Sequence, residues 1–116
     1  MKLLTWTNGR QNSGYRAFTL IYSERFNLDC YILEYKVGSK IPIHRDTVID
    51  SDHYRLNWEF WKAKIGGEFR GKTIWSLFDR VHFFRPDLEE HEVTEIKRGV
   101  RYVFSIGKSF NHKKIQ

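Results

Sequence analysis

Apolar and polar residues alternate along most of this chain, and residues that favour turns interrupt the alternation at short intervals. Because successive side chains of a β-strand point to opposite faces, a period of two predicts strands that are buried on one side. Segments such as "TNGR", "KVGSK", "IGG" and "KRG" supply the glycine and asparagine residues that tight turns require. The strands expected from this pattern cover residues 3–7, 15–22, 30–37, 40–44, 54–61, 68–69 onward, 80–84, 92–96 and 101–106.

Short strands at this spacing predict an all-β fold of the sandwich or barrel type. We expect a minimal jelly roll, because this topology packs about eight strands into two sheets and leaves a mouth between them. Residues 73–79, "TIWSLFD", fit the alternation least well and could hold one helical turn.

The length of 116 residues predicts one domain with one hydrophobic core, and an apolar content of 41% is typical of a folded chain. Residues 109–116 are expected to form a flexible basic tail. Cys30 is the single cysteine, which excludes a disulfide within the chain and favours the reducing cytoplasm. No apolar run approaches the roughly 20 residues that cross a bilayer, so the sequence predicts a soluble protein without a membrane partner.

The formal net charge of +6 is concentrated in residues 97–116, which contain six basic residues and no acidic one. A basic end can contact nucleic acid. A solubilising end is the favoured interpretation, because basic and aromatic residues do not interleave through the chain. Extended geometry also separates residues 98 and 108 by about 30 Å, at ~3.3 Å per residue, so the charge does not collect around one groove.

The segment "IPIHRDTV" begins as a strand-like run and places a histidine and an aspartate two residues apart in an extended stretch of chain. His44 and Asp46 therefore point to the same side. Such a pair is a hydrogen-bonded core couple, an exposed ion pair or two thirds of a metal site.

A third candidate ligand, His91, begins a later predicted strand, and Arg101 follows it after a glycine turn. Two histidines and one carboxylate are the ligand set of the facial triad in non-haem Fe(II) oxygenases. His82 is the rival distal ligand, but no glycine–arginine segment follows it at the same spacing. His53 is expected in a loop and His112 in the tail.

Three segments in order resemble the Fe(II)- and 2-oxoglutarate-dependent dioxygenases, and in particular their prolyl-hydroxylase-like branch. These segments are "YKVGSKIPIHRDT", "YRLNWEFWKAKIGGEF" and "RVHFFRPDLEEHEVTEIKRGVRYVFSIG". The resemblance covers about residues 30–108 and implies a double-stranded β-helix, which is a variant of the jelly roll.

The resemblance also implies that His44, Asp46 and His91 bind iron. Arg101 matches the arginine that pairs with the far carboxylate of 2-oxoglutarate, a role that suits the planar fork of a guanidinium. Tyr35 matches a tyrosine whose hydroxyl helps to hold the same cosubstrate. Fe(II), 2-oxoglutarate and dioxygen are therefore the expected cofactor and cosubstrates.

The strand expected over residues 54–61 matches a strand that lines the floor of the substrate pocket in this family. Alternation along it gives two sets of inward residues, and a shift of one residue exchanges them. The favoured set is Asn57, Glu59 and Trp61, and the other set is Trp58 and Phe60.

We therefore expect an oxygenase that hydroxylates a protein or peptide side chain or a small metabolite. Two alternatives remain open. One is a module on the same fold that binds metal or a dicarboxylate without turnover, and the other is an oxygenase that acts on nucleic acid through the basic C-terminal end. The sequence does not predict an oligomeric state.

Overall fold

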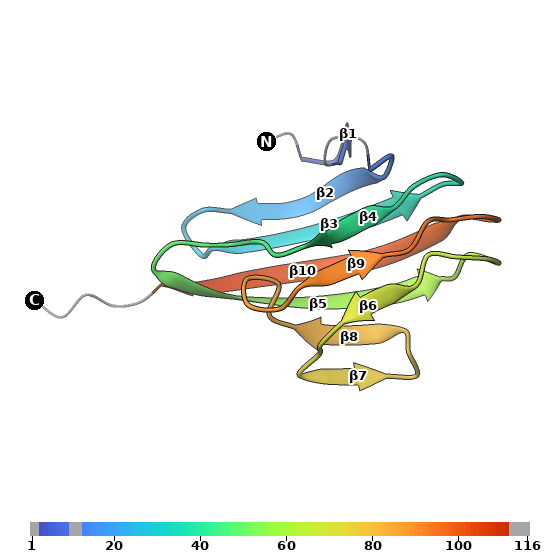
Figure 1. The fold of residues 1–116 in the computed structure, drawn as a ribbon. Helices are drawn as coiled ribbons and strands as arrows, with labels where there is room; N and C mark the ends of the chain where they lie inside the picture. The colour runs from blue at the N-terminus through green and yellow to red at the C-terminus, as the bar shows by residue number, and fades with distance from the viewer. Residues whose placement is uncertain (1–2, 10–12, 112–116) are drawn as a thin grey trace, which may run out of the picture.

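The computed structural model describes residues 3–9 and 13–111, and every regular element in these residues is a β-strand (Figure 1). The all-β fold predicted from the alternation is confirmed. Within the same residues there is no helix of the length and apolar character that a membrane crossing needs. The strands are β1 (Trp6–Asn8), β2 (Arg16–Ser23), β3 (Leu28–Tyr35), β4 (Ile41–His44), β5 (Ser51–Trp61), β6 (Phe69–Gly71), β7 (Trp75–Leu77), β8 (Val81–Phe84), β9 (His91–Val93) and β10 (Arg101–Asn111).

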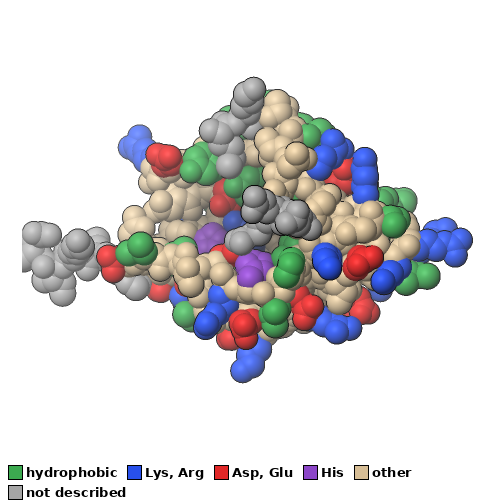
Figure 2. Space-filling view, turned by 45° about the horizontal axis from the view of Figure 1, so that its top comes forward, with side chains coloured by type: hydrophobic (Ala, Val, Ile, Leu, Met, Phe, Trp, Pro, Cys, Tyr) green, Lys and Arg blue, Asp and Glu red, His purple; other side chains and the backbone are tan. Residues whose placement is uncertain are grey.

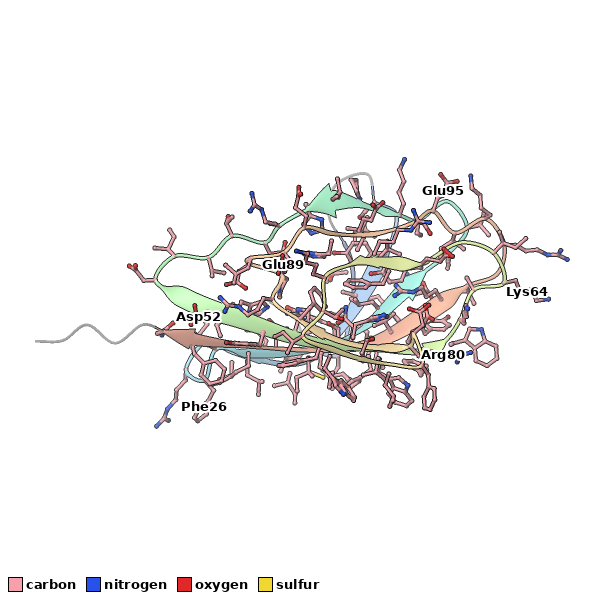
Figure 3. The ribbon with its side chains drawn as sticks, turned by 60° about the horizontal axis from the view of Figure 1, so that its bottom comes forward. Phe26, Asp52, Lys64, Arg80, Glu89 and Glu95 are labelled. Atoms are coloured by element: carbon pink, nitrogen blue, oxygen red, sulfur yellow. The ribbon has the colours of Figure 1, made fainter. Side chains whose placement is uncertain are left out.

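The strands form two antiparallel sheets that lie face to face as two layers, the arrangement of a β-sandwich (Figures 1 and 3). The large sheet has seven strands in the order β1-β2-β3-β10-β5-β8-β7. The small sheet has three strands in the order β4-β9-β6. The chain moves between the layers at almost every step from β3 onward, and this winding brings β4 beside β9 although they are far apart in the sequence.

A compact apolar cluster closes one end of the space between the layers. It contains Tyr35, Ala63, Val93, Ile96 and Val103, and the last two are fully buried at 0% exposure. Ile96 is fixed to the turn between β3 and β4, because its amide donates to the Ser39 carbonyl at 2.9 Å and its own carbonyl accepts from the Gly38 amide at 2.9 Å. The cluster therefore joins the two sheets beside the open part of the interior.

Two expectations about local structure are wrong. The helical turn considered for residues 73–79 is instead strand β7, which pairs with β8 from Trp75 to Leu77. Residues 109–111 belong to β10 and not to a tail, because the strand continues to Asn111 by pairing with the start of β5. The rest of the predicted tail, residues 112–116, lies outside the described residues.

Truncation of Ile96 tests the position of the core. Ile96→Ala is expected to lower the free energy of unfolding by about 2–5 kcal/mol, since it removes a fully buried side chain and leaves a cavity. Ile49→Ala is the matched control, because Ile49 is 89% exposed and its loss should change stability by less than about 0.5 kcal/mol. Urea unfolding measures both values, and equal effects would contradict this placement of the core.

Candidate metal centre

Three side chains from two neighbouring strands of the small sheet converge on one point. His44 is the last residue of β4, His91 is the first residue of β9, and the two are direct partners in the register of this strand pair. Asp46 follows His44 by two residues, and its amide donates to the Pro86 carbonyl at 2.7 Å. Pro86 lies in the loop before His91, so this hydrogen bond attaches the segment that carries Asp46 to that loop.

The three side chains lie close enough together to hold one metal ion. One ligand atom from each of the three residues can be chosen so that all lie within 4.8 Å of one another. His44 Nε2 is 3.3 Å from Asp46 Oδ1, and His91 Nε2 is 3.6 Å from Asp46 Oδ2. The two imidazole rings lie 4.4 Å apart between centroids. The structure therefore brings together the three residues that the sequence predicts as ligands.

Backbone carbonyls orient both histidines. His44 Nδ1 lies 2.7 Å from the Pro42 carbonyl oxygen, and His91 Nδ1 lies 3.0 Å from the Glu89 carbonyl oxygen. A carbonyl oxygen only accepts, so each Nδ1 carries a proton, and in the neutral imidazole Nε2 then has the lone pair that a metal requires. A partner on the second ring nitrogen is the usual arrangement of histidines that ligate metals. Two imidazoles and one carboxylate are donors that suit several divalent metals, among them zinc, copper, nickel and iron.

Aromatic rings shield the histidine that lies deeper in the fold. The ring centroid of His91 is 5.2 Å from Phe84 and 6.3 Å from Phe69. The rival ligand His82 packs against the same Phe69 at 4.6 Å, but its Nε2 approaches Asp79 Oδ1 at 3.4 Å and is not part of the triad. His53 lies in strand β5 and not in the predicted loop; its Nδ1 is 2.7 Å from Ser109 Oγ, and it is not part of the triad. His112 lies outside the described residues.

The three ligands form part of the wall of a cavity of about 360 Å³ between the sheets. The space-filling view shows histidine side chains in a hollow of the molecular surface (Figure 2). Tyr35, Asn57 and Arg101, which were predicted as cosubstrate or pocket residues, line the same cavity. One space therefore contains the metal ligands and the arginine that follows them in the sequence.

A buried ion pair fixes Arg101 in this wall. The side chains of Arg101 and Glu59 are 3% and 8% exposed, and Arg101 Nε donates to Glu59 Oε2. The Arg101 guanidinium carbon also lies 4.7 Å from the centre of the Tyr35 ring. Burial raises the pKa of Tyr35 to about 12, and the positive charge of Arg101 opposes part of that rise. Tyr35 therefore keeps its proton at neutral pH.

Two of the predicted pocket residues do not line the cavity. Glu59 points inward as expected, but it is held behind Arg101 as its ion-pair partner. Trp61 is 60% exposed and lies outside the cavity. A β-bulge explains the error at Trp61. The pairing of β5 with β10 shifts register between Tyr102 and Val103, so the alternation is lost beyond Glu59.

The sequence interpretation missed Arg55 and Ser105, which form a polar network with the predicted Asn57 on the cavity wall that the large sheet provides. Arg55 donates to Ser105 Oγ at 2.7 Å and to Asp29 Oδ1 at 2.6 Å, and Ser105 Oγ donates to Asn57 Oδ1 at 2.5 Å. Arg55, Asn57 and Ser105 all line the cavity. Alternation along the last strand was the available signal, since Ser105 lies four residues after Arg101 and thus on the same face.

No protein-family model and no curated protein matches this sequence. Among solved structures, the chain is similar to a chain in the crystal structure of Rhodobacter sphaeroides SigE in complex with the anti-sigma ChrR. The match has a TM-score of 0.52 and 17% sequence identity, and it covers 89% of this chain and 47% of that one. This chain thus spans about half the length of the chain it matches, and the likeness concerns the fold alone.

Removal of the carboxylate ligand tests the metal centre. Asp46→Asn is expected to weaken Mn(II) or Fe(II) binding by more than about 100-fold, because loss of even an outer partner of a ligand costs 10–100-fold. Asp50→Asn is the matched control, since Asp50 is exposed and its φ of 51° is one that asparagine tolerates. Anaerobic titration calorimetry measures both affinities. Full binding by Asp46→Asn, or retention by His91→Ala with loss in His82→Ala, would show that the ligand set is wrong.

Neutralisation of Glu59 tests the buried ion pair. Glu59→Gln leaves the Arg101 charge buried without a counter-charge, so the free energy of unfolding should fall by about 3–5 kcal/mol. Glu68→Gln is the control, because Glu68 forms an exposed pair with Arg70 at 3.7 Å. Such surface pairs contribute less than about 1 kcal/mol. Urea unfolding distinguishes the two variants, and a small effect of Glu59→Gln would show that the pair contributes little to stability.

Proposed function

We propose that this chain is an Fe(II)- and 2-oxoglutarate-dependent oxygenase on a minimal double-stranded β-helix, a jelly-roll fold. The observation that carries the proposal is the His44, Asp46 and His91 cluster, which opens into a cavity that Arg101 also lines. Iron bound there would supply the activation of dioxygen.

The order of strand pairing supports the jelly roll. The pairs β3–β10, β4–β9 and β5–β8 join the first half of the chain to the second half in reverse order. This is the pairing of one long hairpin that is rolled into two layers. The pairs alternate between the large and the small sheet, as two interleaved Greek keys require.

The residues of the cavity have separate tasks in this proposal. His44, Asp46 and His91 hold the metal at one wall. Arg101 binds the far carboxylate of 2-oxoglutarate, for which it keeps donors, because a guanidinium has five N–H groups and the bond to Glu59 uses one. Tyr35, protonated at neutral pH, presents its ring to the same guanidinium.

The substrate that we favour is a protein or peptide side chain or a small metabolite. Lys97 and Arg98 lie just before β10, whereas Lys108 lies near its other end. About ten residues of strand, roughly 33 Å, separate these charges. They do not form one basic groove around the cavity, so an oxygenase acting on nucleic acid is the weaker alternative.

A metal- and dicarboxylate-binding module without turnover is the second candidate function. It is favoured by the ion pair itself, since Glu59 already compensates the charge of Arg101 and lowers the electrostatic attraction for another carboxylate. Succinate release decides between the candidates. The oxygenase should form succinate from 2-oxoglutarate with Fe(II) and ascorbate, whereas the module should bind 2-oxoglutarate and form none.

The arginine is tested separately by titration of 2-oxoglutarate into the Mn(II)-loaded protein. Arg101→Lys keeps a charge opposite Glu59 but loses the planar fork, so 2-oxoglutarate should bind at least about 10-fold more weakly while Mn(II) affinity is unchanged. Arg55→Lys serves as the matched control, because Arg55 lies in the same sheet and lines the same cavity but is paired with Asp29 and Ser105. Unchanged 2-oxoglutarate affinity in Arg101→Lys would remove Arg101 from the proposal.

A further inference from the structure

The outer face of the large sheet, which points away from the small sheet, carries two complete rows of apolar side chains. Strand register defines each row, because partners in an antiparallel pair lie on the same face. The first row takes one residue from each of the seven strands: Leu77, Val81, Trp58, Phe104, Ile32, Phe18 and Trp6. The second row is Trp75, Phe83, Leu56, Ile106, Cys30 and Ile21. We call these thirteen residues the apolar face.

The inner face of the same sheet is polar where it borders the cavity. Along each strand, a residue that points to the inner face lies between the members of the two apolar rows. These inner residues are Ser76, His82, Asn57, Ser105, Tyr31 and Thr19. An antiparallel sheet with one face in water normally directs its apolar residues inward and its polar residues outward. Here the polarity is reversed across six strands. The sequence pattern is therefore that of a sheet whose outer face is buried.

The described part of the chain buries Cys30 but leaves much of the apolar face open to solvent. Trp58 is 49% exposed, Trp75 50%, Leu77 42% and Trp6 39%. Figure 3 shows side chains that project from the large sheet away from the small sheet, on the side of Phe26. An open apolar groove of about 520 Å³, lined by Leu56, Phe83 and Ile106 among others, continues this surface.

We propose that a second copy of this chain covers the apolar face, so that two large sheets pack against each other around a two-fold axis. The face contains six partly exposed aromatic residues, each of which can bury about 150–250 Å², and seven smaller side chains. Together they offer on the order of 700 Å² of accessible surface to a partner. A standard interface needs about 800 Å² from each partner. A flat sheet is also self-complementary, because two sheets stack with their strands about 30° apart.

The charges at the border of the face favour a second copy over a charged partner. Both apolar rows are uncharged. On one side they are bordered by Arg16 and Glu34, which form an ion pair at 2.7 Å, and on the other by Lys108. A border that carries both signs offers no field that would select a nucleic acid or an acidic protein. A two-fold copy presents the same neutral face and the same border.

The mass of the full chain in solution tests this inference. Sedimentation equilibrium should give a dimer, and thermal unfolding should shift upward with protein concentration. Trp58→Lys, in the centre of the face, should weaken dimerisation by about 30-fold or more, as expected for loss of a tryptophan that contributes about 2 kcal/mol. Leu77→Lys, at the edge of the same row, should act in the same direction.

Leu88→Lys is the matched control, because Leu88 is 55% exposed but lies in the loop between β8 and β9, outside the face. It should remain a dimer. Far-ultraviolet circular dichroism and cooperative unfolding confirm that each variant is folded. The proposal would be overturned if the wild-type chain were monomeric at a protein concentration of about 100 micromolar. Dissociation by Leu88→Lys, or dimers that persist in both face variants, would overturn it as well.

Discussion

The buried ion pair between Arg101 and Glu59 fixes the part of the fold on which the cavity depends. It connects β10 to β5, the two central strands of the large sheet, and the Arg101 guanidinium lies over the ring of Tyr35 on β3. The turn before β6 must approach closely, since a Cβ on Gly67 would lie 3.1 Å from Arg101 Cδ and 2.3 Å from Ile96 Cδ1. Arg101 is therefore closely packed as well as buried, and without Glu59 its charge would be left uncompensated. The pair therefore connects the core at one end of the sandwich to the wall of the cavity that contains the candidate metal ligands.

The same sheet explains why the chain alternates so regularly and yet has a small apolar core. Its inner face provides polar side chains to a cavity, and its outer face provides apolar ones. Alternation alone reports the period of a strand and not which face is buried. A conventional assignment of apolar residues to the inside would place Trp58 in the core and Asn57 in water, which is the reverse of what the structure contains.

Much of the site was predictable because its geometry is local. The i, i+2 relation in an extended segment placed His44 and Asp46 on one side, and the order of the later histidine, glycine turn and arginine, together with the family resemblance, pointed to His91 and Arg101. What failed depends on contacts distant in sequence. The bulge opposite Tyr102 exposes Trp61, and Glu59 pairs with an arginine 42 residues away. Pairing with the start of β5 likewise extends β10 to Asn111, which the polar composition of that segment did not indicate.

The chain segments that carry the two histidines also orient their rings. In both cases Nδ1 meets the carbonyl of the residue two positions earlier, Pro42 for His44 and Glu89 for His91. The same local contact thus sets the tautomer at both sites, and the pairing of β4 with β9 then sets the distance between them. Asp46 alone depends on a tertiary bond, from its amide to Pro86. Because Pro86 lies in the loop that leads to His91, that bond also fixes the carboxylate relative to the second histidine. Pairing of β4 with β9 therefore brings the three ligands together into one cluster.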